Sequence, residues 1–229
     1  CQFTVKNFKS IRDEVTFDMQ AAAISEHEDR IIIDKDEEKY LPVSAIYGPN
    51  GGGKSNVLAA LHTLVAKVLR PLFATEDSEE KVLLQKKIIV EPFVFSESKD
   101  EPTEFELFFR TTVSEYRYIL HVKRDIVLYE SLDRVKLETG RKSALFTRDE
   151  NGIVLKGAFA KLKVSDELSK TLTLLSYLGI AYKGNAVVKD VLSWFEYGIE
   201  FLNYGNPVQE LRMAVSKSED IKKLMLQMI

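Results

Sequence analysis

The stretch YGPNGGGKSN, residues 47–56, determines how the rest of the chain is interpreted. Four glycines and a proline lie within six residues, and Lys54, Ser55 and Asn56 follow them directly. Glycine at this density indicates backbone that must adopt positive φ or approach a ligand closely. The first candidate for that ligand is a phosphate group, and the flanking sequence tests the idea.

The segments on either side of the glycines predict a strand and a helix. Residues 41–48, LPVSAIYG, form an apolar run that predicts a buried strand. Apolar residues then recur at helical spacing from Val57 to Leu69, and Pro71 is expected to end the helix. Strand, glycine loop and helix in this order are typical of a phosphate-binding loop.

The glycine stretch also fits the pattern G-x-x-x-x-G-K-[ST]. Inward-facing N–H groups of such a loop form an anion nest that side chains would obstruct, and the helix N-terminus adds a positive dipole end. Lys54 is expected to bind the β- and γ-phosphates, and Ser55 to offer an oxygen to Mg²⁺. The pattern thus nominates Gly48, Gly51, Gly52, Gly53, Lys54 and Ser55 for nucleotide binding, with Ser55 also as the metal ligand.

Composition limits the class of protein. The chain has 229 residues, 45% of them hydrophobic and 29% charged, with a net charge of −3, as in an ordinary globular protein. This charge gives no support for binding nucleic acid or an acidic membrane. The single cysteine, Cys1, excludes a disulfide framework and a cysteine-based zinc site. Without a signal-peptide pattern or an 18-residue apolar run, we expect a cytoplasmic protein that does not bind membranes.

Beyond the glycine loop, the periodicity predicts a hairpin, an antiparallel sheet and helices. Residues 3–8 and 14–19 alternate as two strands that should pair. From about Lys86 the period is two, and after Lys163 helical spacing returns with Leu168, Leu172 and Leu175 on one stripe. The five further strands are expected at 87–95, 103–109, 115–122, 125–132 and 143–148, and a second helical stripe contains Val188, Val191, Leu192, Phe195 and Ile199.

Two stretches carry a resemblance to a known group of proteins. FTVKNFKSIRDEVTFDM, residues 3–19, and SAIYGPNGGGKSNVLAAL, residues 44–61, resemble the N-terminal half of ABC-type ATPases of the chromosome-maintenance, DNA-repair and overcoming-lysogenization-defect group. Four later segments resemble a narrower set, the bacterial AAA-type, ABC-like ATPases of phage-defence and abortive-infection systems. These segments are FVFSESKDEPTEFELFF (93–109), YRYILHV (116–122), LYESL (128–132) and ALFTRDENG (144–152).

The resemblance implies further site residues and the cofactors ATP and Mg²⁺. Lys9 and Ser10 match the turn NF-[KR]-S, which faces the nucleotide phosphates in the wider group, although Lys9 could also be a solvated turn lysine. Asn50 and Asn56 match the form G-x-N-x-x-G-K-S-N. Asn50 could bond a phosphate or the catalytic water, or could brace the loop.

Several parts of such an ATPase are missing from the sequence. No apolar run ends in Asp-Glu, and neither the serine-glycine signature nor the later histidine switch is present. The segment IIVEP, residues 88–92, is interpreted as a structural strand, and His27, His62 and His121 have no metal-ligand spacing. We therefore nominate no catalytic residue and expect the chain to lack hydrolytic competence by itself.

An aromatic and basic cluster, Tyr116, Arg117 and Tyr118, could stack on nucleic-acid bases. In an alternating strand, however, these residues first indicate a half-exposed sheet face. Arg12, beside the Lys9–Ser10 pair, could help to stabilise charge, but the sequence gives no firm support for that role.

The predicted fold is α/β: a P-loop NTPase, an ABC-ATPase-like lobe with an antiparallel β-subdomain and the start of a helical subdomain. Residues 1–85 would hold the hairpin and the strand–loop–helix, 86–160 the β-subdomain and 161–229 a truncated helical subdomain. The chain begins without methionine inside a strand pattern and stops inside a helical pattern at 218–229. We expect an N-terminal fragment of one ATPase domain.

Three functional hypotheses follow. The first is an ATP-hydrolysing switch of a bacterial defence system, in which two or more copies sandwich ATP and control a nuclease or toxin effector. The second is a DNA-repair ATPase that clamps nucleic acid, which predicts a basic surface. The third is a P-loop kinase, which the antiparallel sheet disfavours.

Overall fold

The computed structural model describes residues 1–22, 28–34, 37–73, 88–95, 97–165 and 167–201. The chain divides into two compact units, Cys1–Glu196 and Tyr197–Ile229. The first unit contains both sheets and the helices α1 and α3. The sequence predictions for 204–207 and 218–229 fall outside the described residues.

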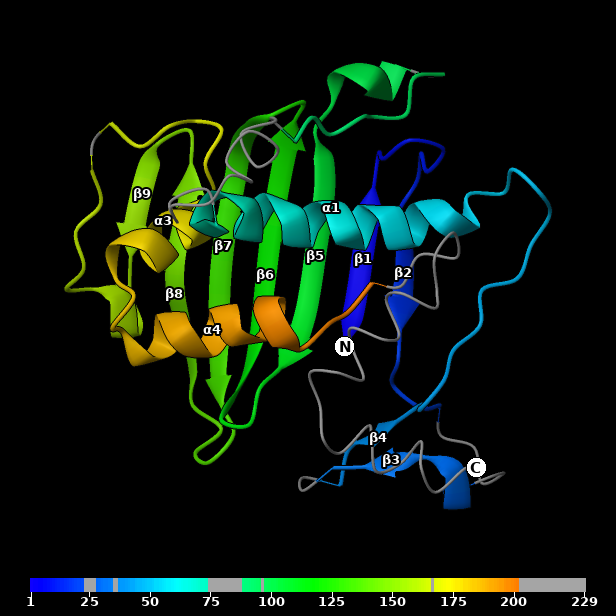
Figure 1. Ribbon diagram of the computed structural model, residues 1–229, viewed down its shortest axis with the longest axis horizontal. Coiled ribbons are helices and arrows are strands. Elements are labelled where there is room, and N and C mark those ends of the chain that lie inside the picture. Colours follow the sequence, from blue (N-terminus) through cyan, green and yellow to red (C-terminus); the bar gives the residue numbers. More distant parts are fainter. Residues whose placement is uncertain (23–27, 35–36, 74–87, 96, 166, 202–229) are drawn as a thin grey trace. The chain divides into compact units, whose positions relative to one another are not determined.

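A seven-stranded antiparallel sheet has the order β2-β1-β5-β6-β7-β8-β9, and among the described residues the helices α1, α3 and α4 cross one of its faces (Figure 1). A separate two-stranded sheet pairs β3 (Ile32–Ile33) with β4 (Lys39–Tyr40), and short 3-10 helices lie at Glu28–Arg30, Glu97–Asp100 and Gly157–Phe159. The seven strands are β1 (Gln2–Lys6), β2 (Val15–Asp18), β5 (Thr103–Arg110), β6 (Ser114–Lys123), β7 (Ile126–Lys136), β8 (Lys142–Asp149) and β9 (Gly152–Leu155), and the helices are α1 (Lys54–Phe73), α3 (Leu174–Ala181) and α4 (Ala186–Tyr197).

Period-two alternation explains the sheet. In β6 the residues Tyr116, Tyr118 and Leu120 are buried, and the residues between them point to the other face. The predicted hairpin is confirmed, because β1 pairs with β2 and places Phe3 opposite Phe17. The strands expected from 103 to 148 are confirmed as β5 to β8. The short strand β9 was not predicted.

The long helix α1 packs its apolar side into the core. Length and composition alone would allow it to span a membrane, but seven of its residues are buried inside the protein, as in a core helix. The expected end at Pro71 is wrong, because the helix continues to Phe73. Pro71 lies in the last turn, where the hydroxyl of Ser176 donates a hydrogen bond of 2.7 Å to the carbonyl of Val68.

Two predicted strands are wrong. Residues 41–48 and 88–95 are outside every named strand of the described chain, with only a single bridge between Val90 and Arg124. Tyr47 and Phe95 are 89% and 86% exposed. The N–H of Leu41 donates to the carbonyl of Met19 at 2.8 Å, just beyond β2, but no ladder continues along residues 42–48, where Pro42 has no N–H to donate.

The helix predicted to follow Lys163 starts later than expected. Leu168 and Leu172 precede α3, whose first turn is capped by the Thr173 side chain accepting from the N–H of Ser176. The preceding segment is held open by Arg148, which donates to the carbonyls of Leu172 (2.6 Å) and Ser169 (3.1 Å). The N–H of Ser176, which would bond the Leu172 carbonyl in a continuing helix, instead donates to the Thr173 side chain.

A buried carboxylate joins the sheet to α3. Glu130 on β7 is fully buried and accepts from the N–H groups of Leu174 (2.6 Å) and Leu175 (2.9 Å), while the hydroxyl of Tyr118 donates to it at 2.9 Å. Burial raises the pKa of Glu130, against the opposing effect of these donors.

Helix α4 covers the aromatic side of β5 and β6. The Trp194 and Phe109 rings lie 4.7 Å apart between centroids, and the hydroxyl of Tyr116 donates to Asp190 at 2.6 Å. Tyr116 and Tyr118 are therefore buried rather than half-exposed, which corrects the sequence interpretation and excludes both rings from base stacking. Arg117 lies on the other face, paired with Glu106.

Candidate nucleotide-binding site

The glycine loop is an exposed turn that requires left-handed backbone at two positions. Gly51 has φ +82° and Gly53 has φ +83°, values that residues with a side chain rarely adopt. The N–H of Gly52 donates to the carbonyl of Pro49 at 3.1 Å, which closes the turn. Asn50 lies exposed within it. Of the four glycines nominated from the sequence, Gly51 and Gly53 are therefore used for their backbone conformation.

The helix α1 begins immediately after this loop, at Lys54. Its first turn, all of which the structure describes, contains no acidic residue to offset the positive end of the helix dipole. The ammonium group of Lys54 donates to the carbonyls of Gly48 (2.8 Å) and Pro49 (2.7 Å), so the side chain folds back along the loop. A cation, a helix N-terminus and a glycine turn thus converge at one exposed place, where an anion would be stabilised.

The turn formed by Lys9 and Ser10 meets the glycine loop from a distant part of the sequence. Phe8 and Ile11 exchange backbone hydrogen bonds of 2.8 and 2.7 Å, which makes Lys9 and Ser10 the tip of a tight turn. The amide of Asn56 donates to Ser10 Oγ at 2.7 Å. A Cβ atom on Gly53 would lie 2.9 Å from the same oxygen. The fold therefore brings this predicted pair together with the loop.

The Lys9 side chain extends from that turn. Lys9 has φ +49°, its ammonium group lies 5.5 Å from the centre of the Phe8 ring, and the residue is exposed. Arg12 lies nearby, but its guanidinium binds the carboxylate of Asp13 at 2.7 Å. That hydrogen bond lowers the pKa of Asp13 and raises the pKa of Arg12. Lys9 is therefore the better candidate cation of this turn.

Sequence reasoning missed the residue that holds this turn in place. Asn7 is fully buried, and its side chain bonds three backbone groups in segments far along the chain. The only clue in the sequence is that an asparagine begins the phrase NFKS, a residue type that tolerates positive φ.

Metal binding at the loop would depend on Ser55. Among the residues that the structure describes, no group of three or more histidine, cysteine, aspartate or glutamate side chains could hold a metal ion. Ser55 is exposed in the first turn of α1 and presents one hydroxyl oxygen. A single protein oxygen fits Mg²⁺ that also binds phosphate oxygens and water.

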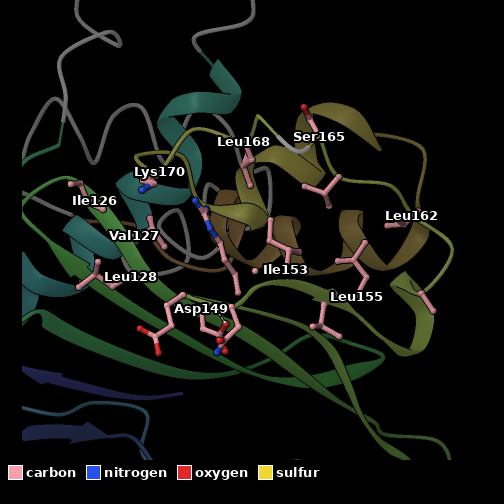
Figure 2. Close-up of a pocket in the computed structure, with 17 residues that line it drawn as sticks. Ile126, Val127, Leu128, Asp149, Ile153, Leu155, Leu162, Ser165, Leu168 and Lys170 are labelled. Atoms are coloured by element: carbon pink, nitrogen blue, oxygen red, sulfur yellow. Dashed lines mark hydrogen bonds between the residues drawn. The ribbon is translucent and has the colours of Figure 1, made fainter.

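A large cavity lies elsewhere, at the β9 edge of the sheet. It has a volume of about 1320 Å³ and is bounded by β7, β9 and residues 160–165 and 168–170 (Figure 2). Its walls combine apolar residues, such as Ile153, Leu155 and Leu162, with charged ones, such as Asp149 and Lys170. Because the glycine loop contacts the β1–β2 connection, near the opposite edge of the sheet, this cavity is separate from the candidate phosphate site.

Comparison with known proteins identifies the domain. A family model described as "AAA domain, putative AbiEii toxin, Type IV TA system" matches residues 43–179, more than half of the chain. The match includes the glycine loop, α1 and β5 to β9, whereas Lys9 and Ser10 lie before it. No curated protein matches the chain.

Proposed function

The chain belongs to this AAA-domain family, and from that premise we propose that its glycine loop binds ATP with Mg²⁺ as part of a nucleotide-driven defence switch. The family is one of P-loop NTPases, and it points to ATPase activity in a toxin–antitoxin or defence context. The ligand, the site residues and the switch role are our proposal.

One observation carries the proposal: the convergence of positive-φ glycines, the α1 N-terminus and the ammonium group of Lys54. These groups are the donors that phosphate oxygens require. In the proposed complex, Lys54 leaves the carbonyls of Gly48 and Pro49 and binds the β- and γ-phosphates. The N–H groups of residues 50–55 surround the phosphates.

The remaining site residues have supporting roles in this proposal. Ser55 would provide one oxygen to Mg²⁺, and the bound ion would supply positive charge beside the phosphates. Lys9 and Ser10 approach the phosphates from the facing turn, and Asn50 and Asn56 belong to the loop and the first turn of the helix. We assign no residue of 1–229 to activation of the attacking water.

The biological role follows from the defence context. We propose that two or more copies bind ATP between them in the cytoplasm and that the nucleotide state controls a nuclease or toxin effector. Residues 1–85, 86–160 and 161–229 would then be parts of one ATPase lobe. The DNA-clamp alternative gains no support from the open sheet face, because Lys6 pairs with Glu104 and Arg117 with Glu106.

The test is a titration with a fluorescent ATP analogue in the presence of Mg²⁺. The unmodified chain should bind it, and Lys54→Ala should weaken binding roughly a hundredfold, because two charge-assisted contacts are lost at about 1.5 kcal/mol each. Lys142→Ala, which removes an exposed lysine from β8, is the matched control and should bind normally.

Circular dichroism melting curves establish that each variant is folded. If the unmodified chain failed to bind the analogue, or if folded Lys54→Ala bound it as tightly, the assignment of the loop would be wrong.

A further inference from the structure

Asn7 is a fully buried polar residue at the base of the turn that carries Lys9 and Ser10. Its side-chain oxygen accepts from the N–H of Phe93 at 2.9 Å. Its side-chain nitrogen donates to the carbonyls of Glu101 (3.0 Å) and Pro102 (3.2 Å). One amide group therefore ties the turn to two later segments of the chain.

The backbone of Asn7 is fixed as well. Its carbonyl accepts from the hydroxyl of Thr103 at 2.6 Å, and its N–H donates to the carbonyl of Arg12 at 3.2 Å. The residue has φ +55°, a conformation that asparagine and glycine tolerate better than most residues. An aspartate would keep the acceptor oxygen but would lose both side-chain donors.

This anchor determines where the tip of the turn lies. Two residues beyond Asn7, the N–H of Lys9 donates to the carbonyl of Glu91 at 2.9 Å. The next residue, Ser10, receives the Asn56 amide at 2.7 Å. Because Ser10 Oγ already accepts from Asn56, its own hydroxyl hydrogen must point elsewhere and can be donated to an anion.

We propose that Asn7 is a positioning residue of the nucleotide site, which acts through Lys9 and Ser10 by holding their turn at the phosphate-binding loop. The inference rests on the proposed function, because it assumes that a nucleoside triphosphate occupies the loop. Asn7 itself does not touch the ligand. It sets the distance at which the ammonium group and the hydroxyl meet the phosphates.

The test is a double-mutant cycle read out as the affinity for a fluorescent ATP analogue with Mg²⁺. Asn7→Gly keeps the backbone conformation but removes the three side-chain bonds. We expect it to weaken binding about tenfold, the size of one hydrogen bond to a charged group. Lys9→Ala with Ser10→Ala should produce a similar loss. Adding Asn7→Gly to that pair should cost no further affinity, because the groups through which it acts are gone.

Two further variants keep the test decisive. Thr111→Val removes a hydrogen bond of 3.0 Å to Asp190, remote from the turn, and should lower stability without changing affinity. If Asn7→Gly does not fold, Asn7→Asp takes its place in the cycle. It should weaken binding in the unmodified background and leave affinity unchanged in the double-alanine background.

Each outcome has a defined meaning. The positioning role would be overturned if the affinity losses of the Asn7 variant and of the double-alanine variant multiplied when the two were combined. It would also be overturned if a folded Asn7 variant bound the analogue normally. Either result would leave ATP binding intact. Absence of binding by the unmodified chain would instead overturn the proposed function.

Discussion

Polar groups are used in opposite ways in two regions of this molecule. Under α3, Glu130 is fully buried and each of its partners lies in the core. At the phosphate edge, defined as residues 7–12 and 47–56, the tip residues Lys9, Ser10 and Ser55 are exposed. The contrast fits the proposal that the sheet and α3 supply stability, whereas the edge offers groups to a ligand.

The helix α1 belongs to both regions. Its N-terminus meets Ser10 through Asn56, and further along the helix the ammonium group of the buried Lys67 donates to the carbonyl of Asp125 at 2.8 Å. The Ser176 hydroxyl of α3 binds the carbonyl of Val68. The helix therefore connects the exposed edge to the buried region. Because the residues of interest lie at different places along it, mutations can disturb the stability of the buried region and the groups of the exposed edge separately.

The largest expected effect is on the buried side of this comparison. Glu130→Ala leaves two N–H groups of α3 and the hydroxyl of Tyr118 without their acceptor in the core. We expect the free energy of unfolding to fall by about 3 kcal/mol or more, as measured by denaturant titration.

Glu130→Gln is the control, since it keeps an acceptor oxygen of similar shape and should lose less stability. The folded fraction of Glu130→Ala should still bind the ATP analogue. If Glu130→Ala lost less stability than Glu130→Gln, or if its folded fraction bound the ATP analogue poorly, the separation between a stabilising region and a ligand-binding edge would be contradicted.

A smaller effect is expected on the exposed side, at Gly53. An alanine there would be forced into φ +83°, at a cost of about 1 kcal/mol, and its Cβ would lie 2.9 Å from Ser10 Oγ. Because the turn must move away, Gly53→Ala should weaken binding of the ATP analogue roughly tenfold, the size of one lost charge-assisted contact.

Gly140 offers a matched control for that prediction. It has φ +62°, and a Cβ there would meet no atom within 4 Å. Gly140→Ala should therefore show a similar loss of stability with unchanged affinity. Equal affinity in the two variants would show that the contact between the loop and the turn is irrelevant to binding.

Much of this fold follows from the sequence because its strands are amphipathic and its loop has a strict pattern. Strands β5 and β6 alternate between a buried and an open face, so their period reveals them. Residues 41–48 form an apolar run, but a strand also needs a partner for its backbone groups, and the structure places this run in no strand. An apolar run by itself contains no information about whether a partner strand is available.

The site was only partly accessible to sequence reasoning for a related reason. Glycine, lysine and serine at fixed spacing predict the loop, because each residue type has a chemical role there. The role of Asn7 depends on carbonyl and N–H groups about 90 residues away, which have no side-chain identity in the sequence. Such a contact becomes visible only when the chain is folded.

The most direct test of the account is hydrogen exchange of the chain with and without ATP and Mg²⁺, followed by mass spectrometry. The account predicts slower exchange in peptides that cover residues 8–11 and 48–56, with no change in β6 to β8. Protection confined to the cavity between β7 and β9, or no protection of the glycine loop at saturating ATP, would contradict it.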